Sequence, residues 1–147
     1  MRRKTMTPKP GTFLALPLKE GLFGFGRALE DPYMAFYNWA SETSEQDLAE
    51  LDGRPILFKV AVRLFDSDGW KEIGRQPLSD DLKKPVQMWM EDARSPTGFF
   101  VFDSLGYRHP GTKEEVATLE RASVWDAHNV VHRLEDTLVS PRSSSDE

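Results

Sequence analysis

Two histidines have the clearest spacing for chemistry. His128 and His132 are four residues apart, so on a helix they would share one face, as the ligands of a zinc site do. The metalloprotease pattern requires glutamate directly after the first histidine, and this chain has Asn129 there. Neither Glu135 nor Asp136 completes a known spacing for a third ligand. We therefore predict partly exposed helix histidines without a metal, and an enzyme that uses this pair with nearby acids is kept as an alternative.

Other catalytic patterns are missing from the sequence. The chain has no cysteine, which excludes disulfides, cysteine nucleophiles and cysteine-based zinc sites. Asp66 and Asp68 precede Gly69, but the distal glutamate of an EF-hand loop does not follow, so we predict a plain turn. Carboxylates that are adjacent in sequence, such as Glu114 and Glu115, diverge on a regular element. We predict no catalytic residue and no cofactor.

Charge and length limit the class of partner. The 147 residues carry a formal net charge of −5 and suit a single domain. The negative balance disfavours nucleic acid. Because the sequence has no apolar run long enough for a signal peptide or for the roughly 20 residues of a membrane span, we expect a soluble, cytoplasmic protein with no membrane partner.

One stretch of the chain collects acidic residues without any lysine or arginine. Its members, called the acidic segment below, are Glu42, Glu45, Asp47, Glu50 and Asp52. Such a run is usually a solvated face, but it can also attract a basic partner at long range. The same stretch predicts a short helix that Ser41 or Ser44 caps and Gly53 ends.

Apolar runs predict strands in the first part of the chain. We expect a hairpin from Phe13–Leu18 and Leu22–Leu29, followed by a strand over Tyr33–Tyr37. Gly24 and Gly26 are two residues apart, so they should face the same way and leave a trough for another backbone or ring.

Further strands follow the acidic segment. Pro55–Phe65 alternates and should pair antiparallel with Trp70–Gly74 across the intervening turn. Pro85–Asp92 alternates again, and Trp89 lies off its apolar face, either as a half-buried ring or as an interface anchor. Phe99–Phe102 is a last short strand.

Helical patterns follow from Asp103 onward. Thr112 and Glu115 form a capping-box pattern, and a second helix is expected from Trp125 or Asp126 to Leu138. We therefore predict an α+β fold, in which a strongly curved, barrel-like antiparallel sheet over residues 12–102 is covered by C-terminal helices. Residues 1–9 should form a flexible basic arm, residues 10–139 one domain, and residues 140–147 a disordered tail.

Several short motifs follow one another along the chain. They are Lys9-Pro10-Gly11-Thr12-Phe13, Leu16-Pro17-Leu18, Phe23-Gly24-Phe25-Gly26-Arg27, Pro55-Ile56-Leu57-Phe58, Trp70, Ile73-Gly74-Arg75-Gln76-Pro77-Leu78 and Glu114-Glu115-Val116-Ala117-Thr118-Leu119-Glu120. In this order they resemble the Imm26 immunity proteins of bacterial polymorphic toxin systems. Thr12 departs from the pattern, because the resemblance leads us to expect an acidic residue there.

The resemblance implies an immunity protein that neutralises a cognate toxin domain by direct one-to-one binding. The residues that would carry its structural signature are Pro10, Gly11, Gly24, Gly26, Arg27, Trp70, Gly74, Glu115, Leu119 and Glu120. Candidate toxin-binding residues are the acidic segment, Trp89, Glu91 and Asp92. The alternative is a non-catalytic regulatory or interaction module built on a small curved sheet, and the oligomeric state is left open.

Overall fold

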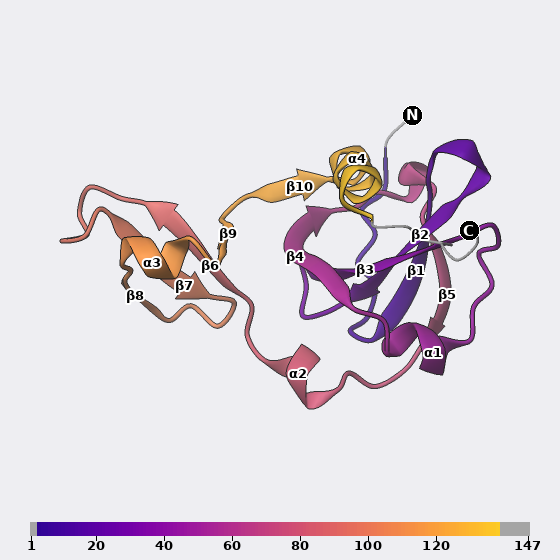
Figure 1. Cartoon of the computed structure of the whole chain (residues 1–147), viewed down its shortest axis with the longest axis horizontal. Helices are drawn as coiled ribbons and strands as arrows, with labels where there is room; N and C mark the ends of the chain where they lie inside the picture. The colour runs from indigo at the N-terminus through magenta and orange to yellow at the C-terminus, as the bar shows by residue number, and fades with distance from the viewer. Residues whose placement is uncertain (1–2, 139–147) are drawn as a thin grey trace, which may run out of the picture. The chain divides into compact units, whose positions relative to one another are not determined.

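A computed structural model describes residues 3–138 of the chain (Figure 1). These residues form two compact units: the first comprises the chain up to Leu82 and from Val124 onward, and the second is Lys83–Ser123. Ten strands in two sheets and four α-helices occur within residues 3–138, so the predicted α+β class is confirmed. Each unit is described by itself.

The first unit contains a six-stranded sheet. Its strands are β1 (Thr12–Pro17), β2 (Phe23–Ala28), β3 (Tyr33–Ser41), β4 (Ile56–Arg63), β5 (Lys71–Arg75) and β10 (Val124–Asp126). They lie in the order β10-β4-β3-β2-β1-β5, and every neighbouring pair is antiparallel except β10 and β4. The strand order is open, with β10 and β5 at its ends, so barrel-like closure stays a prediction.

The predicted hairpin is confirmed. β1 and β2 pair antiparallel around the single-turn 3₁₀ helix η1 (Lys19–Gly21). β3 extends beyond the predicted Tyr37 to Ser41, because a bulge in its pairing with β2 lets the ladder continue past Gly24.

The predicted pairing of β4 with β5 is wrong. Between the two strands lies η2 (Asp66–Asp68), which ends at the left-handed Gly69. One edge of β4 is occupied by β3 and the other by β10, so β5 pairs with β1 instead. A strand has only two edges, and its sequence pattern does not say which neighbours will occupy them.

Two hydrophobic clusters lie on opposite faces of this sheet. The larger contains Leu14, Leu16, Phe36 and Val60, and the smaller contains Phe13, Ala15, Phe25, Tyr37 and Leu51. The alternation of neighbouring β1 residues between the clusters follows from the period of two in a strand.

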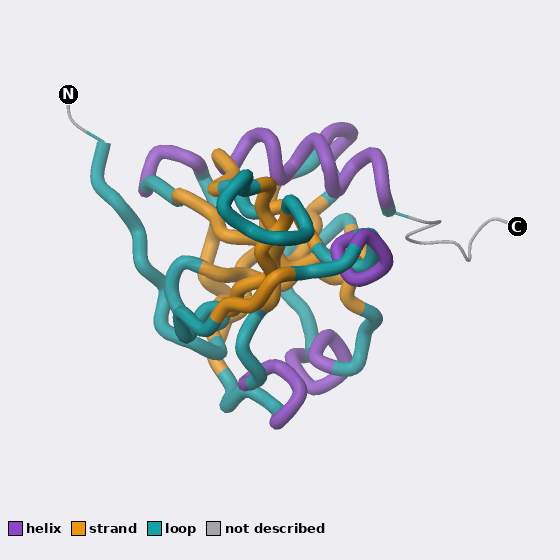
Figure 2. Tube along the Cα trace, turned by 90° about the vertical axis from the view of Figure 1, so that its left-hand side faces the viewer, coloured by secondary structure: helices purple, strands orange, loops and turns teal. Residues whose placement is uncertain are grey.

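Helix α4 (Ala127–Thr137) covers the larger cluster. Val130 and Leu134 are fully buried there, one turn apart, as the helical spacing predicts. Figure 2 shows α4 in side view, leading toward the C-terminus. The prediction of a helix that ends near Leu138 is confirmed.

Gly24 and Gly26 form the predicted trough toward this cluster. A Cβ atom built on Gly24 would lie 2.6 Å from Leu134 Cδ2, and one on Gly26 would lie 2.8 Å from Phe36 Cε1. Real Cβ atoms do not approach other atoms so closely, so both positions require glycine or a shift of the neighbouring side chain. The trough is filled by α4 and by a core ring.

Replacing Gly26 with valine is expected to lower the free energy of unfolding by more than about 1 kcal/mol, because the branched side chain would collide with the buried Phe36. Thermal and denaturant unfolding measure the effect. Gly53→Val is the control, since a Cβ there has no neighbour closer than 3.6 Å. An unchanged melting temperature for Gly26→Val would contradict the steric account.

Helix α1 (Leu48–Asp52) follows β3, but its predicted N-cap, Ser41 or Ser44, is wrong. Asp47 is the N-cap, and its carboxylate accepts hydrogen bonds from the amides of Ala49 and Glu50 at 3.0 and 3.2 Å. The serines lie too far upstream of the first helical turn to reach those amides. Gly53 ends the helix as predicted. A short helix, α2 (Asp80–Lys83), occupies a stretch with no clear sequence signal.

The second unit has its own four-stranded sheet. Its strands are β6 (Gln87–Glu91), β7 (Phe99–Asp103), β8 (Arg108–Pro110) and β9 (Glu120–Arg121), in the order β8-β7-β6-β9. The prediction of one antiparallel sheet over residues 12–102 is therefore wrong. β6 and β7 find partners in the short strands β8 and β9, and β9 pairs parallel to β6.

Helix α3 (Lys113–Val116) lies in the second unit. The Thr112 hydroxyl accepts a hydrogen bond from the Glu115 amide at 3.1 Å, so the predicted N-cap is confirmed. The Glu115 carboxylate, however, pairs with His109 Nε2 at 2.8 Å. The predicted capping box therefore has only its first half, because β8 brings a histidine within reach of the glutamate.

The first described residues pack on the first unit. Thr5 forms a β-bridge with Phe65, and the Met6 amide donates to the Leu64 carbonyl at 2.9 Å. Arg3 lies over the Phe65 ring, 4.0 Å from its centroid. The flexibility of the basic arm at residues 1–9 stays a prediction, and the predicted tail at residues 140–147 lies outside the described residues. No helix within residues 3–138 has the length and apolar character to cross a membrane.

Candidate functional site

The acidic segment lies in the connection between β3 and β4. Upstream of α1 the backbone is held by hydroxyl groups, since the Thr43 amide donates to Ser41 Oγ at 3.2 Å and the Glu45 amide donates to Thr43 Oγ1 at 3.1 Å. Gln46 Nε2 also donates to the Thr43 carbonyl at 3.2 Å. This connection is thus a defined local structure.

An aromatic contact attaches the connection to β3. Trp39 Nε1 donates to Gln46 Oε1 at 3.1 Å, and the Arg54 guanidinium lies over the indole ring, 3.6 Å from its centroid. A cation over an indole face is stabilised by the ring quadrupole. The two contacts hold the connection against β3 on both sides of α1, at Gln46 before the helix and at Arg54 after it.

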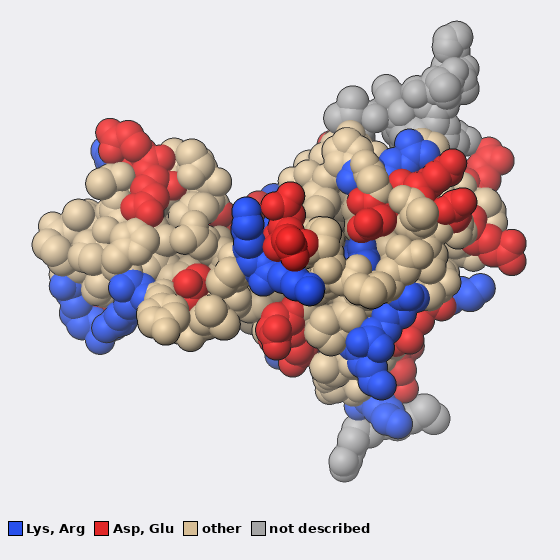
Figure 3. Space-filling model, turned by 90° about the horizontal axis from the view of Figure 1, so that it is seen from below, with Lys and Arg blue, Asp and Glu red and all other residues tan. Residues whose placement is uncertain are grey.

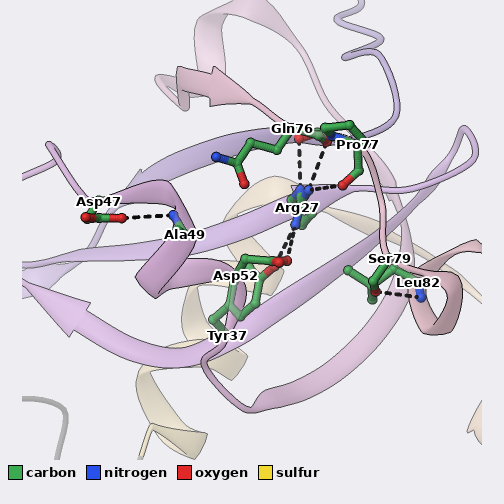
Figure 4. Close-up of polar contacts among 10 residues, drawn as sticks. Arg27, Tyr37, Asp47, Ala49, Asp52, Gln76, Pro77, Ser79 and Leu82 are labelled. Carbon is green, nitrogen blue, oxygen red and sulfur yellow. Dashed lines mark hydrogen bonds and ion pairs between the residues drawn. The ribbon is translucent and has the colours of Figure 1, made fainter.

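A fully buried arginine anchors the end of the acidic segment. Arg27 Nη1 donates to Asp52 Oδ1 at 2.7 Å and to the Tyr37 hydroxyl at 3.3 Å (Figure 4). Burial raises the pKa of Tyr37, and the hydrogen bond from Arg27 partly opposes that increase. Asp52 therefore balances a buried charge in addition to contributing to the surface charge.

The same guanidinium joins two distant backbone segments through three carbonyl groups. Arg27 Nε donates to the Gly11 carbonyl at 2.8 Å, and Nη2 donates to the carbonyls of Gln76 and Pro77 at 2.9 and 3.2 Å. The Phe13 ring covers the group, with 3.9 Å from the guanidinium carbon to the ring centroid. Three of the motifs that the sequence presents separately therefore meet at one side chain.

Steric contacts explain other signature glycines. Gly11 has a positive φ of 95°, and a Cβ there would collide with the Gln76 carbonyl oxygen. A Cβ on Gly74 would collide with Leu48 Cδ1. Both residues permit a close approach that brings the β5 region against β1 and α1.

The remaining signature residues have separate positions. Trp70 is buried in the larger cluster, with its ring 5.8 Å from that of Phe36 and nearly perpendicular to it. Leu119 and Glu120 lie after α3, both half-buried, and Pro10 is exposed beside Gly11. The residues expected to carry the structural signature thus lie in both units, and most of them make packing or backbone contacts.

The five residues of the acidic segment differ in the contacts that their carboxylates make. Asp47 caps α1, and Asp52 pairs with Arg27. Glu42, Glu45 and Glu50 are exposed. Within residues 3–138, the carboxylates of Glu45 and Glu50 have no hydrogen-bond or ion-pair partner. These two are the members whose charge is available to a partner without a structural cost.

The face of the molecule drawn in Figure 3 carries charges of both signs. Figure 3 shows acidic and basic side chains interspersed, without a broad field of one sign. An acidic surface built on residues 42–52 would therefore act locally, over roughly one Debye length of 8–10 Å at physiological salt.

The other candidates lie on β6 in the second unit. Trp89 is half-buried and packs edge-on against Phe99, with 5.7 Å between ring centroids. Arg121 lies 5.5 Å from the Trp89 centroid and also 3.6 Å from the Glu91 carboxylate. The ring is thus partly covered by its own unit.

Asp92 is bound within its own turn. Arg94 Nη2 and Nε donate to its two carboxylate oxygens at 2.6 and 2.9 Å, and the Arg94 amide adds a third bond at 2.9 Å. The Arg94 side chain is the main reason that the pKa of Asp92 falls to about 2. Asp92 stays charged at neutral pH, but its charge is already paired.

His128 and His132 share a face of α4 as predicted, with 5.9 Å between their ring centroids. Both side chains are exposed. Within residues 3–138, no group of three or more histidines and acidic residues has an arrangement that could hold a metal ion.

The sequence pattern missed two features of the site. Arg27 lies in the predicted strand Leu22–Leu29, but its complete burial and its pairing with Asp52, 25 residues away, were not predicted. The Trp39–Arg54 contact was also missed. An arginine amid aromatic and glycine residues on a buried strand was the only available indication.

The comparisons with known proteins give one match. The family model described as Immunity protein 26 matches residues 9–99. No curated protein and no solved structure matches the chain.

Proposed function

This chain belongs to the Immunity protein 26 family, and on that premise we propose that it neutralises a cognate toxin domain by direct one-to-one binding, without turnover. Family membership is the observation that carries the proposal. The proposal includes action in the bacterial cytoplasm, as the resemblance of the sequence implies.

We propose that the acidic segment is a toxin-binding surface. Support comes from the exposed Glu45 and Glu50 carboxylates, which have no partner within residues 3–138. Their backbone is held by the Asp47 cap and by the Arg27–Asp52 pair. Carboxylates carried on such a backbone would accelerate encounter with a basic cleft, because complementary charge raises the association rate. Trp89, Glu91 and Asp92 stay candidate contacts on the second unit.

Co-expression tests the function. We expect the neighbouring gene to encode a toxin, whose terminal domain arrests growth when produced alone. Co-expression of this chain should restore growth, and the two proteins should co-purify in a 1:1 ratio. A toxic domain that this chain neither neutralises nor binds would refute the proposal for that pair.

Charge reversal tests the surface. The variant Glu45→Lys/Glu50→Lys should slow association by about tenfold or more at low salt, because steering contributes 10-fold or more to such rates. Its association rate should also depend less on salt than that of the wild type. Stopped-flow or surface-plasmon measurements over a salt series give both quantities.

The control carries the same change in net charge elsewhere. Glu72→Lys/Asp136→Lys alters two exposed positions outside the acidic segment. Asp47 and Asp52 are left intact, because their loss would affect folding. Equal association rates for the two double variants would place the binding surface elsewhere.

A further inference from the structure

The turn between β7 and β8 exposes two large apolar side chains. Leu105 is 66% exposed and Tyr107 is 74% exposed, the two highest values among large hydrophobic residues within residues 3–138. They are separated only by Gly106, at one tip of the second unit's sheet. Scattered exposed apolar residues are common, but two so close together require a reason.

The conformation of this turn does not depend on these two side chains. Asp103 Oδ1 accepts hydrogen bonds from the amides of Leu105 and Tyr107 at 2.9 and 3.2 Å. The Asp103 amide donates to the Tyr107 carbonyl, and the Gly106 amide donates to the Asp103 carbonyl, both at 3.0 Å. Gly106 supplies the positive φ of 95° that the turn requires.

A second set of bonds holds the turn to the beginning of β6. The Ser104 amide donates to the Val86 carbonyl at 3.0 Å, and the Val86 amide donates to Ser104 Oγ at 3.1 Å. The tip therefore presents Leu105 and Tyr107 from a backbone that is already ordered. A partner that binds it would not have to order this loop.

We propose that the tip formed by Leu105 and Tyr107 inserts into an apolar pocket of the cognate toxin domain. The proposal rests on the proposed function, since membership of the immunity family is what implies a protein partner. The tip lies outside residues 9–99, the part of the chain that matches the family model.

The chemistry of the pair suits such a contact. Tyrosine is enriched among the residues that dominate binding energy, since it buries a large rigid ring at low entropic cost and leaves its hydroxyl for a polar partner at the rim. Leucine adds apolar area beside it. Because burial of apolar surface acts after encounter, these contacts should govern dissociation, whereas the acidic segment governs association.

The test measures binding of the purified toxin domain by the variant Leu105→Ala/Tyr107→Ala. Dissociation should become at least about tenfold faster, with an association rate within about twofold of wild type and unchanged salt dependence. The control is Val124→Ala, which truncates an apolar residue that is 59% exposed on β10. The melting temperature of Leu105→Ala/Tyr107→Ala should equal that of the wild type, because the hydrogen bonds of the turn come from the backbone and from Asp103.

The outcomes of this experiment distinguish a toxin contact at the tip from a contact between two copies of the chain and from no contact at all. If the wild type binds and the double variant dissociates at the same rate, the tip is not a toxin contact, although the proposed function stands. If the wild type does not bind the toxin domain, both proposals fail. If the variant abolishes self-association of the free protein and toxin binding is unchanged, a second copy of the chain is the occupant and the proposal is overturned. The single variants Leu105→Ala and Tyr107→Ala give the same readout should the double variant fold poorly.

Discussion

Replacing Arg27 with methionine is expected to lower the free energy of unfolding by about 3 to 5 kcal/mol, the cost of breaking a buried charged pair by removing one partner. The fully buried guanidinium serves Asp52, Tyr37 and three carbonyl groups. Methionine fills similar space but donates no hydrogen bond, so the buried Gly11 carbonyl and the partly buried carbonyls of Gln76 and Pro77 would lose their partner. Chemical denaturation followed by tryptophan fluorescence measures the loss.

Two further variants separate charge from geometry. Arg27→Lys keeps the positive charge but lacks the planar set of five donors, so it should recover only a small part of the lost stability. Arg63→Met is the control, because Arg63 is exposed and pairs with an exposed Asp126 at 3.5 Å; its effect should stay below about 1 kcal/mol. A stability of Arg27→Met within the range of Arg63→Met would show that the buried network contributes little.

Replacing Leu134 with alanine is expected to lower the free energy of unfolding by about 2 to 5 kcal/mol, the range for a buried leucine. Leu134 is fully buried, and it connects α4 to β2 across Gly24. Its loss would leave a cavity between the helix and the sheet. Unfolding monitored by circular dichroism gives the value, and the exposed Asp136→Ala on the same helix is the control.

A double-mutant cycle tests whether Gly24 and Leu134 are complementary in size. Gly24→Ala alone should destabilise the protein, because its Cβ would lie 2.6 Å from Leu134 Cδ2. In the Leu134→Ala background that contact is gone, so the same change should cost less, with a coupling of about 0.5 to 3 kcal/mol. Strictly additive effects would mean that Leu134 moves aside without cost.

The candidate site could be predicted only in part. The position of the acidic segment and the exposure of Glu45 and Glu50 follow from a polar run between two strands. The sequence did not distinguish Glu45 and Glu50 from Asp47 and Asp52, because all four contribute one negative charge to the same stretch. One caps a helix and the other pairs with a buried arginine, so only two of the four are free for a partner.

The sequence by itself determined the features that depend on neighbours along the chain. The β1–β2 hairpin follows from two apolar runs around a glycine-containing connector, the Thr112 cap from its spacing to Glu115, and α4 from apolar residues at helical intervals. The order of the family motifs also sufficed to place the chain in its family. These are local or linear properties, so no knowledge of the tertiary structure is needed to read them.

Only the tertiary structure decided which distant segments meet. β5 pairs with β1 because both edges of β4 are taken, and β9 and β10 are too short to carry a periodic pattern. The burial of Arg27 depends on carbonyls and a carboxylate from segments 16 to 50 residues away. A charged side chain can be buried only where such partners converge, and that convergence is a property of the folded chain, because the cost of desolvation is offset by groups that no local pattern specifies.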